Sequence, residues 1–516
     1  MKRGPVQRFA AWLHGRVNPP QSRTYYAGAA VNRLTADFLK AGSSGTQEVR
    51  ADLATLRMRA RQLCRDNPNA RRYLAILSDN VVGPDGLLLQ ARTENARGQL
   101  HEELNRQIEQ AWKSWSKPAH CTVDGRTSWP MLQSQIVQTV ARDGECFVRM
   151  VRGFPNRFGF ALQLLDAELC DETYDRPARP GEPEIRNGVE VDGWGRPTGY
   201  WLWTAHPDDY GKPRVRQRFA AEDVLHITIT DRMGQVRGLS WFAPVLLPLQ
   251  MLYGYTEAEL TAARTAAAKM GFITQSPETP GLDLGQTEPT AMEAAPGVID
   301  RLAVGEQFTA WDPTHPSGNF GPFLTTILHQ IASGLNVSHA SLTGDLSQVN
   351  YSSIRAGMLA ERDRWRALQT WFADHVCDPV FAAWFPMATL SPELTVPSTD
   401  MRRYEAREWQ ARGWDWVDPQ KDIEAQASAL AYGFTTRRAI LAANGLDFEQ
   451  TITDTKAERE FLEAQGVEFA SPKSAPAPAD APSPGETEST PTDTSEDQTE
   501  DRGGRPRLRA VRSAPR

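Results

Sequence analysis

The residues best suited to chemistry are four carboxylates in one short stretch of the chain: Asp166, Glu168, Asp171 and Glu172. A pair of carboxyl groups can act as the acid and base of a hydrolase, and several carboxylate oxygens together can bind a divalent cation. No matching partner cluster is evident elsewhere in the sequence. A metal-dependent nuclease that uses residues 166–172 is therefore the enzyme alternative, and it is not the function that the sequence favours.

Aromatic and histidine residues nearby give no stronger indication of catalysis. Trp201 and Trp203 could form a platform on which a sugar stacks, but they lie two apart on one expected strand, where packing into a core is ordinary. His226, on a later expected strand, is more often a satisfied core histidine than a ligand or a base. These residues therefore predict no catalytic site.

Sequence motifs for nucleotide hydrolysis, acyl transfer and metal binding are absent. The chain has no GxxxxGK[ST] phosphate loop, no GxSxG turn, no HExxH and no Cys/His cluster. Its five cysteines are widely spaced without a CxxC pair, which fits reduced core thiols better than disulfides or a zinc site. We therefore expect no enzyme activity, no cofactor and no metal.

Composition argues against a coat that wraps nucleic acid. The 516 residues carry a formal net charge of -7, whereas neutralising phosphates requires an excess of Lys and Arg. An acidic body can still let DNA pass. No apolar run approaches the roughly 18 residues of a membrane span, and the N-terminus lacks the apolar segment of a signal peptide. We expect a soluble protein that acts inside a cell, without a membrane partner.

A polar loop between two expected helices stands out in the second half of the chain. An apolar helix ends before it, and the serines at 352 and 353 cap the long helix that follows. The loop and the first helical residue are Leu346, Ser347, Gln348, Val349, Asn350 and Tyr351. The flanking helices should hold this segment in place.

The long helix carries two stripes at helical spacing. Its apolar stripe should be buried, and it comprises Tyr351, Ile354, Met358, Trp365, Leu368 and Phe372. Arg355, Arg362 and Arg366 form a separate basic stripe, about a quarter-turn away. This stripe could face a polyanion, and the alternative is a solvated face that is salt-bridged to Glu361 and Asp363.

Three segments resemble the lambda-type family of tailed-phage portal proteins. They are LTGDLSQVNYSSIRAG at 342–357, HITITDRMGQVRGLSWFAPVL at 226–246 and RGWDWVDPQKDIEA at 412–425. The resemblance covers roughly residues 25–466, and its helix, excursion, helix, loop and long helix follow the family's order. The N-terminal arm and the C-terminal tail lie outside it.

The resemblance implies a head-tail connector rather than an enzyme. Such subunits form a ring, a homododecamer, at one capsid vertex, through which double-stranded DNA is packaged and ejected by sequence-independent contacts. The implied partners are the terminase large subunit, the major capsid and scaffold proteins, and the head-completion proteins. The implied location is the virion, with the host cytoplasm during assembly. Residues 346–351 would be the tunnel loop that projects into the channel, with Arg355 at its helical exit and Arg362 and Arg366 as possible channel-facing residues.

The expected fold class is α+β, a portal-type fold whose parts follow the resemblance. They are a mobile N-terminal arm (1–45), a wing region of helices and then mixed sheet (46–243), a first stem helix (244–271), an irregular clip (272–319), a second stem helix (320–341), the tunnel loop (342–353), a long helix with a wing return (354–399), crown helices (400–471) and a disordered tail (472–516).

Periodicity predicts most of these elements from the residues themselves. Helices are expected at 47–66, 68–80, 100–115, 253–270, 320–333 and 437–444, and strands at 145–151, 158–166, 198–204 and 224–230, with a hairpin at 191–203. Residues 271–319, with a short strand or turn near 298–302, and the proline-bearing stretch 385–397 are expected to be irregular. The first two helices are rich in arginine, for which solvated surface or contacts to acidic neighbouring subunits are expected before nucleic acid.

A non-channel capsid or tail protein is the remaining alternative. It predicts assemblies that lack an axial hole and deletion particles that still package DNA. A conducting ring predicts large closed rings in electron micrographs.

Overall fold

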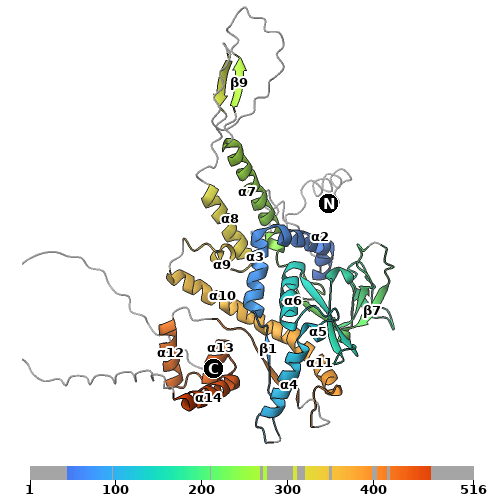
Figure 1. Cartoon of the computed structure of the whole chain (residues 1–516). Helices are drawn as coiled ribbons and strands as arrows, with labels where there is room; N and C mark the ends of the chain where they lie inside the picture. The colour runs from blue at the N-terminus through green and yellow to red at the C-terminus, as the bar shows by residue number, and fades with distance from the viewer. Residues whose placement is uncertain are drawn as a thin grey trace, which may run out of the picture. The chain divides into compact units, whose positions relative to one another are not determined.

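The computed structural model describes residues 44–466, apart from 96, 210, 268–270, 276–305, 311–319, 348–350, 398–403 and 415–418. The chain has two compact units, Met1–Thr451 and Ile452–Arg516. The described part is mixed α and β, as the expected fold class requires (Figure 1). Most of the expected N-terminal arm, the strand or turn at 298–302 and the C-terminal tail lie outside the described residues.

Two helices open the described chain, and their caps explain where they begin. Ser44 accepts a hydrogen bond from Gln47 N at the start of α2, and Asn67 accepts from Asn69 N and Ala70 N at the start of α3. Both expected helices are confirmed. The elements of this region are α2 (Gly45–Asp66), α3 (Pro68–Leu77), a π-helical turn (Ser78–Val82), β1 (Leu88–Ala91), α4 (Glu102–Trp115), α5 (Pro118–Cys121) and α6 (Trp129–Asp143).

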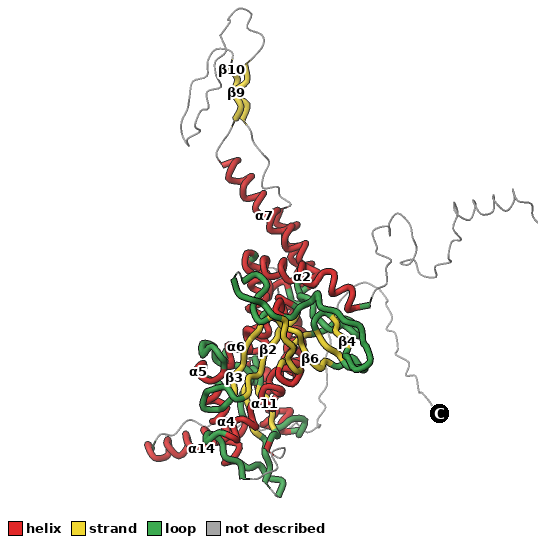
Figure 2. Tube along the Cα trace, turned by 90° about the vertical axis from the view of Figure 1, so that its right-hand side faces the viewer, coloured by secondary structure: helices red, strands yellow, loops and turns green. Residues whose placement is uncertain are grey.

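The region that follows is mostly sheet, as predicted. One antiparallel sheet has the order β3-β2-β8, and a second has the order β4-β5-β6-β7. Helices α5, α6 and α11 pack against the first sheet, and Figure 2 shows α6 beside β2. The strands are β2 (Glu145–Arg152), β3 (Phe160–Leu165), β4 (Glu184–Arg186), β5 (Val189–Val191), β6 (Pro197–Trp203), β7 (Arg216–Ala220) and β8 (Val224–Thr228), with short 3-10 turns at Ala167–Leu169, Ala221–Asp223 and Ala243–Val245.

The stretch expected to be an irregular excursion contains a hairpin. Helices α7 (Leu246–Ala267) and α8 (Phe320–Gly334) contact each other, and the segment between them includes β9 (Gly271–Gln275) and β10 (Glu306–Ala310). These strands pair antiparallel, so the prediction of an irregular segment is wrong for residues 271–275 and 306–310. The prolines of this stretch all lie outside the two strands, where they block no ladder hydrogen bond.

A second correction concerns residues 385–390, the first part of the 385–397 stretch that was expected to be irregular; residues 391–397 are irregular, as predicted. The long helix α10 (Tyr351–Phe372) continues through a π-helical turn (Ala373–Cys377) into α11 (Asp378–Leu390), with Pro386 inside the helix. Proline removes one helical hydrogen bond there. The fully buried Phe381, Trp384 and Phe385 hold this helix against the core, so packing overrides the local preference.

The C-terminal part is helical, and one strand returns to the start of the chain. β11 (Arg407–Gln410) pairs antiparallel with β1, which joins segments more than 300 positions apart. The remaining helices are α9 (His339–Thr343), α12 (Pro419–Ala431), α13 (Arg437–Ala443) and α14 (Phe448–Gln465). Thr436 caps α13 by accepting from Ala439 N, which confirms the expected helix start. No helix within the described ranges has both the length and the apolar character needed to cross a bilayer.

An aromatic cluster around Trp112 of α4 joins the helices to the sheet. Trp112 is 4% exposed, and its ring lies within 5.8 Å, between centroids, of five other aromatic rings. Those rings are Trp115, Trp129, Phe381, Trp384 and Trp409. The cluster thus connects α4, α6, α11 and β11.

Replacing Trp112 by Ala should therefore destabilise the subunit strongly. We expect the free energy of unfolding to fall by about 3–5 kcal/mol, the usual cost of a large aromatic cavity. Trp194 at the tip of the β5-β6 hairpin is 96% exposed, so Trp194→Ala should change stability by no more than about 0.5 kcal/mol. Urea unfolding followed by circular dichroism measures both variants, and equal losses would contradict the assignment of the core.

Candidate functional site

The carboxylates that suggested an enzyme are each matched by an arginine. Arg61 of α2 bonds Asp166 at 2.7 Å and Glu168 at 2.9 Å. Glu172 accepts from Arg57 Nη1 at 3.3 Å, and Asp171 is paired with Arg216. Hydrolytic acid-base pairs need carboxyl groups that are free to contact a substrate or a water molecule, and all four carboxylates are instead engaged by guanidinium groups.

Asp166, Glu168 and His206 also lie close enough to be considered as a cation site. Each offers one ligand atom, and these atoms lie within 4.8 Å of one another. His206 Nε2 is, however, already 2.9 Å from Glu168 Oε2, and Arg61 bonds both carboxylates. Burial raises the pKa of Asp166, but bonds from Glu168 N and Arg61 outweigh it and lower that pKa overall. The arrangement is a charge-balanced contact between α2 and the sheet region.

Behind these residues lies an ionic cluster that sequence reasoning did not find. Glu145 and Arg237 are fully buried and Arg57 is 1% exposed. Arg237 Nε lies 2.9 Å and 2.8 Å from the two carboxylate oxygens of Glu145, and Arg57 Nη2 lies 3.1 Å from Oε1. His226 Nε2, at 3.0 Å, and the backbone N–H of Gly238, at 3.2 Å, complete the contacts of Glu145. We call Arg57, Glu145, His226 and Arg237 the buried ionic cluster.

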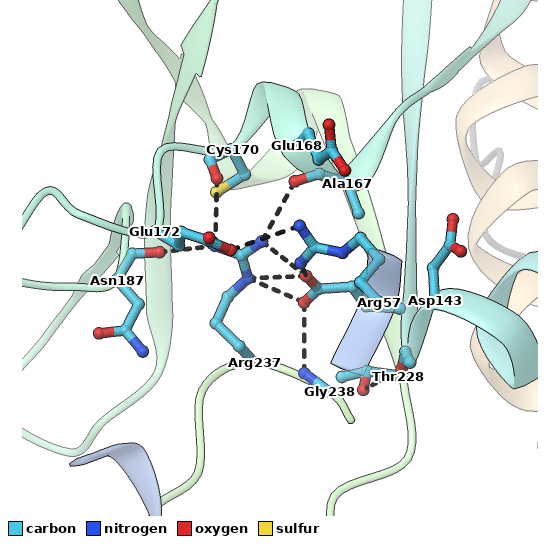
Figure 3. Close-up of polar contacts among 12 residues, drawn as sticks. Arg57, Asp143, Ala167, Glu168, Cys170, Glu172, Asn187, Thr228, Arg237 and Gly238 are labelled. Carbon is cyan, nitrogen blue, oxygen red and sulfur yellow. Dashed lines mark hydrogen bonds and ion pairs between the residues drawn. The ribbon is translucent and has the colours of Figure 1, made fainter. Parts of the chain in front are cut away.

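The backbone of the sheet region satisfies the rest of Arg237. Its Nη1 donates to the carbonyl oxygens of Asn187 at 2.8 Å and Cys170 at 3.3 Å, and its Nη2 donates to Ala167 O at 3.2 Å. Figure 3 shows the Arg237 guanidinium among these carbonyl groups, with the Arg57 side chain beside it. Arg237 therefore joins β2, the 167–170 segment and the turn between β4 and β5.

Electrostatics keep this cluster charged. Burial raises the pKa of Glu145, but the positive charge of Arg237 and the hydrogen bonds from His226 and Arg237 outweigh it and hold that pKa well below its usual range. Burial lowers the pKa of Arg237, and the nearby negative groups more than reverse this, leaving it above its usual value. The expectation that His226 is a satisfied core histidine is confirmed. The prediction that the arginines of α2 form solvated surface is wrong for Arg57.

Signals for this cluster were present in the sequence but not decisive. Arg57 falls on the same helical face as Val49, Leu53 and Ala60, which are buried. A charged residue in that position indicates a buried partner. The partner, Glu145, is 88 positions away, and nothing in one sequence identifies it.

The polar loop is the second feature of interest, and the structure describes its first half. α9 ends at Gly344, which has a φ of 74°, and the chain then runs through Asp345, Leu346 and Ser347. Leu346 is 59% exposed, and Ser347 is also exposed. Gln348, Val349 and Asn350 lie outside the described residues, and so do the side chains of Tyr351 and Ile354.

Helices on both sides fix the ends of this loop. Glu361 of α10 accepts a hydrogen bond from Ser341 Oγ at 2.7 Å and another from Ser338 N, so α10 binds the start of α9. Farther along α10, Trp365, Leu368 and Phe372 are buried, which confirms that part of the apolar stripe. Met358 is 41% exposed, so the prediction is wrong there, because the Ser78–Val82 and Ala373–Cys377 turns pack on the far half of α10.

The basic stripe of α10 contacts α12 and the segment before it. Arg355 bonds Asp422 at 2.9 Å, and the guanidinium carbons of Arg362 and Arg366 lie 5.8 Å and 5.6 Å from the centre of the Trp414 ring. Arg366 also pairs with Asp363 at 2.8 Å, as the salt-bridge alternative anticipated. These contacts anchor α10, and the channel-facing role of the stripe stays a prediction.

Comparison with known proteins identifies the family. A model of the family described as phage portal protein, lambda family, matches residues 31–369. The probable portal protein of Halomonas phage phiHAP-1 is 34% identical over 427 residues, which cover 80% of this chain and 82% of that protein. The chain belongs to the lambda family of phage portal proteins. Portal protein B of Escherichia phage lambda is 22% identical, covering 79% of this chain and 84% of that protein.

Membership makes this portal protein a structural component of the tailed-phage virion rather than an enzyme, and it implies an oligomeric ring in the virion neck. The nuclease alternative is therefore wrong. Among solved structures, a chain described as the neck of an empty GTA particle is similar with 16% identity and a TM-score of 0.43, covering 77% of this chain and 93% of that chain.

Replacing Glu145 by Gln should destabilise the portal subunit. The amide keeps the shape of the side chain but leaves the buried Arg237 without its counter-charge and Arg57 with Glu172 alone, which we expect to cost about 3–5 kcal/mol in free energy of unfolding. Glu222 is exposed, so Glu222→Gln is the matched control and should be near neutral. Denaturant titration measures both, and a neutral Glu145→Gln would contradict the cluster's role.

The same carboxylate predicts an acid-sensitive stability. Because the pKa of Glu145 is lower in the folded state than its ordinary value of 4.5, its contribution is fully present above about pH 4.5 and is lost as the pH falls toward the folded pKa. The stability difference between wild type and Glu145→Gln should therefore be constant near neutrality and shrink below about pH 4.5. Unfolding curves measured from pH 7 to pH 3 test this, and a difference that grows on acidification would contradict it.

Proposed function

We propose that the portal chain is the subunit of a dodecameric ring at one capsid vertex, and that double-stranded DNA is packaged and ejected through its axial channel. In this proposal residues 346–351 form a tunnel loop that projects toward the DNA. The proposal includes the assignment of α7 and α8 to a stem, of β9 and β10 to a clip, of residues 46–243 to a wing and of the helices after residue 400 to a crown.

The observation that carries the loop assignment is the exposure of Leu346 between two anchored helices. At 59% exposure this leucine contributes little to the core of its own subunit, although the flanking α9 and α10 are fixed by Glu361 and by buried aromatic residues. A segment whose flanking helices are fixed and whose own side chains are exposed is suited to contact a molecule outside the subunit. The double-stranded DNA of a portal channel is the partner that the family suggests.

Sparse charge in the loop fits a passing polymer better than a bound one. Ser347 is uncharged, Asp345 is the one acidic or basic residue in 344–351, and Arg355 is paired with Asp422 at 2.9 Å. Strong pairing with phosphates would hold DNA in one position, whereas weak, sequence-independent contacts let it slide. We expect Gln348, Asn350 and Tyr351, together with Arg355, to be the groups nearest the duplex.

Exposed apolar residues on α7 and α8 support ring assembly. Leu247, Met251 and Leu260 of α7 are 68%, 66% and 63% exposed, and Phe323 of α8 is 50% exposed. A cavity of about 510 Å³ with a mostly apolar lining lies between these helices. Such a surface is costly in water, and contact with neighbouring copies would cover it.

The ring would work with separate proteins at each stage. The terminase large subunit would supply the ATPase that drives packaging, because no phosphate loop is present in this chain. Head-completion proteins would then replace the terminase, while the major capsid and scaffold proteins surround the vertex. Assembly would take place in the host cytoplasm.

Crosslinking from the loop tests the proposal directly. All five native cysteines are buried, so an exposed cysteine can be labelled selectively with a photoactivated crosslinker. We expect Ser347→Cys to crosslink DNA in filled particles, and Trp194→Cys, on the wing hairpin, to give little or no crosslink. Electron micrographs of the purified protein should show closed rings with an axial hole. Assemblies without a hole, or equal crosslinking from both sites, would favour a non-channel structural protein.

A further inference from the structure

A cavity of about 580 Å³ lies at the start of α2. Its lining contains several arginine and carboxylate side chains, unlike the proposed channel loop, which is almost uncharged. The start of α2, the β4-β5 turn and the 232–234 loop surround it. Four arginines line the cavity, against two carboxylates, Asp175 and Glu184. The arginines are Arg50, Arg176, Arg186 and Arg232. Each of these arginines is paired with a carboxylate, Arg50 with Asp175, Arg176 with Glu182, Arg186 with Glu184 and Arg232 with Glu48, so the lining is charge-balanced and offers spare guanidinium donors rather than net positive charge.

The first amides of α2 add partial positive charge at the same place. Ser44 O and Oγ accept from Gln47 N, and Ser44 O also accepts from Glu48 N. The amides of Gly45 and Thr46 have no acceptor among the described residues. The N-terminus of a 22-residue helix such as α2 favours an anion, both through such amides and through the helix dipole.

Asn187 supplies a second, independent observation. It is 1% exposed and lines the cavity, and neither its Nδ2 nor its Oδ1 has a hydrogen-bond partner within the structure. Only its backbone oxygen contacts Arg237, and Figure 3 shows its amide turned away from that guanidinium. Arg176 Nε is likewise buried without a partner. Buried polar groups are rarely left unpaired, so these donors indicate a bound polar group.

The arginine pairings leave donors available for such a group. Arg186 bonds Glu184 through Nε and Nη2, which leaves Nη1 unused in that pair. Arg50 uses Nη1 on Asp175 at 2.8 Å, and about half of its side chain is exposed. Guanidinium groups with spare N–H donors bind phosphate oxygens in preference to chloride because they match the oxyanion's geometry.

We propose that this cavity binds a phosphate group, held by the amides of Gly45, Thr46 and Asn187 and by the guanidinium N–H groups of Arg50, Arg176 and Arg186 that their carboxylate partners leave unused. The phosphate group would belong either to a small ligand, such as inorganic phosphate or a nucleotide, or to the backbone of DNA. Both sources present negatively charged phosphate oxygens. Asn187 has a φ of 49°, which asparagine tolerates and which places its side chain at the cavity wall. The site is independent of the channel loop and adds an anion-dependent contact between α2 and the β4-β5 turn.

Titration of sodium phosphate into the full-length protein at constant ionic strength tests the proposal. Calorimetry should show saturable binding, with sodium chloride as the blank. Asn187→Gly keeps the backbone conformation and removes the amide, so affinity should fall about tenfold, the usual effect of losing a hydrogen bond to a charged group. Arg196→Ala on the exposed hairpin tip is the control and should bind as wild type does.

A variant that is expected to raise the phosphate affinity distinguishes a loss of binding from a loss of structure. Glu184→Gln removes a carboxylate that competes for Arg186, so phosphate affinity should rise by a few-fold, whereas Arg186→Gln should weaken it. A purely structural role for these residues would lower affinity or stability in both variants. Absence of saturable phosphate binding to the wild type, or identical affinities for wild type and Asn187→Gly, would overturn the proposal.

A second titration distinguishes the sources of the phosphate. A short DNA duplex is titrated into wild type and Asn187→Gly at the same ionic strength. If the duplex also binds Asn187→Gly about tenfold more weakly, the site takes backbone phosphates. If only inorganic phosphate or a nucleotide is affected, the site takes a small ligand. If the crosslinking experiment contradicted the proposed channel, the phosphate-binding result would still stand, because Ser347 does not line the cavity.

Discussion

One carboxylate, Glu145, determines how the first half of the described chain must come together. It lies at the start of β2 with no exposure to solvent, and it can remain charged there only if cations and hydrogen-bond donors surround it. Those groups come from α2, β8 and the 237–238 loop, so all three must be in place before the charge is satisfied. Closely packed glycines enforce the same geometry, since a Cβ on Gly238 would lie 2.0 Å from Gly144 O. The cluster therefore specifies the fold more than it adds net stability.

The acidic residues between 166 and 172 surround this cluster on its more exposed side. Their arginine partners come from α2 and β7, so the charges that suggested catalysis connect secondary-structure elements instead. Each pair holds two elements together through direct hydrogen bonds.

Much of the fold could be predicted from the sequence where local signals were strong. Caps at Asn67 and Thr436, and alternation in the strands, placed those elements within a few residues of their true ends. α6 was not predicted, although Ser128 before it, Pro130 inside its first turn and Gly144 behind it are the expected boundary residues. Pro386 led to the wrong prediction of a loop, because the burial of Phe385 and Trp384 outweighs the one helical hydrogen bond that proline removes. The buried ionic cluster could not be predicted, because its members are scattered from 57 to 237. The loop was located by its resemblance to a family, and its outer half lies beyond the residues that the structure describes.

The attachment of α10 gives the loop a mechanical property. Near its end Gln369 is buried and donates from Nε2 to Asn80 O at 2.9 Å and to Arg412 O at 3.2 Å, while Tyr351 at the other end adjoins the loop. The rise of an α-helix puts these two residues about 27 Å apart, so a tilt of about 5° around Gln369 would displace the loop end by about 2 Å. Because Glu361 of the same helix bonds α9, such a tilt would displace α9 as well, by a larger distance than the movement at Gln369 itself.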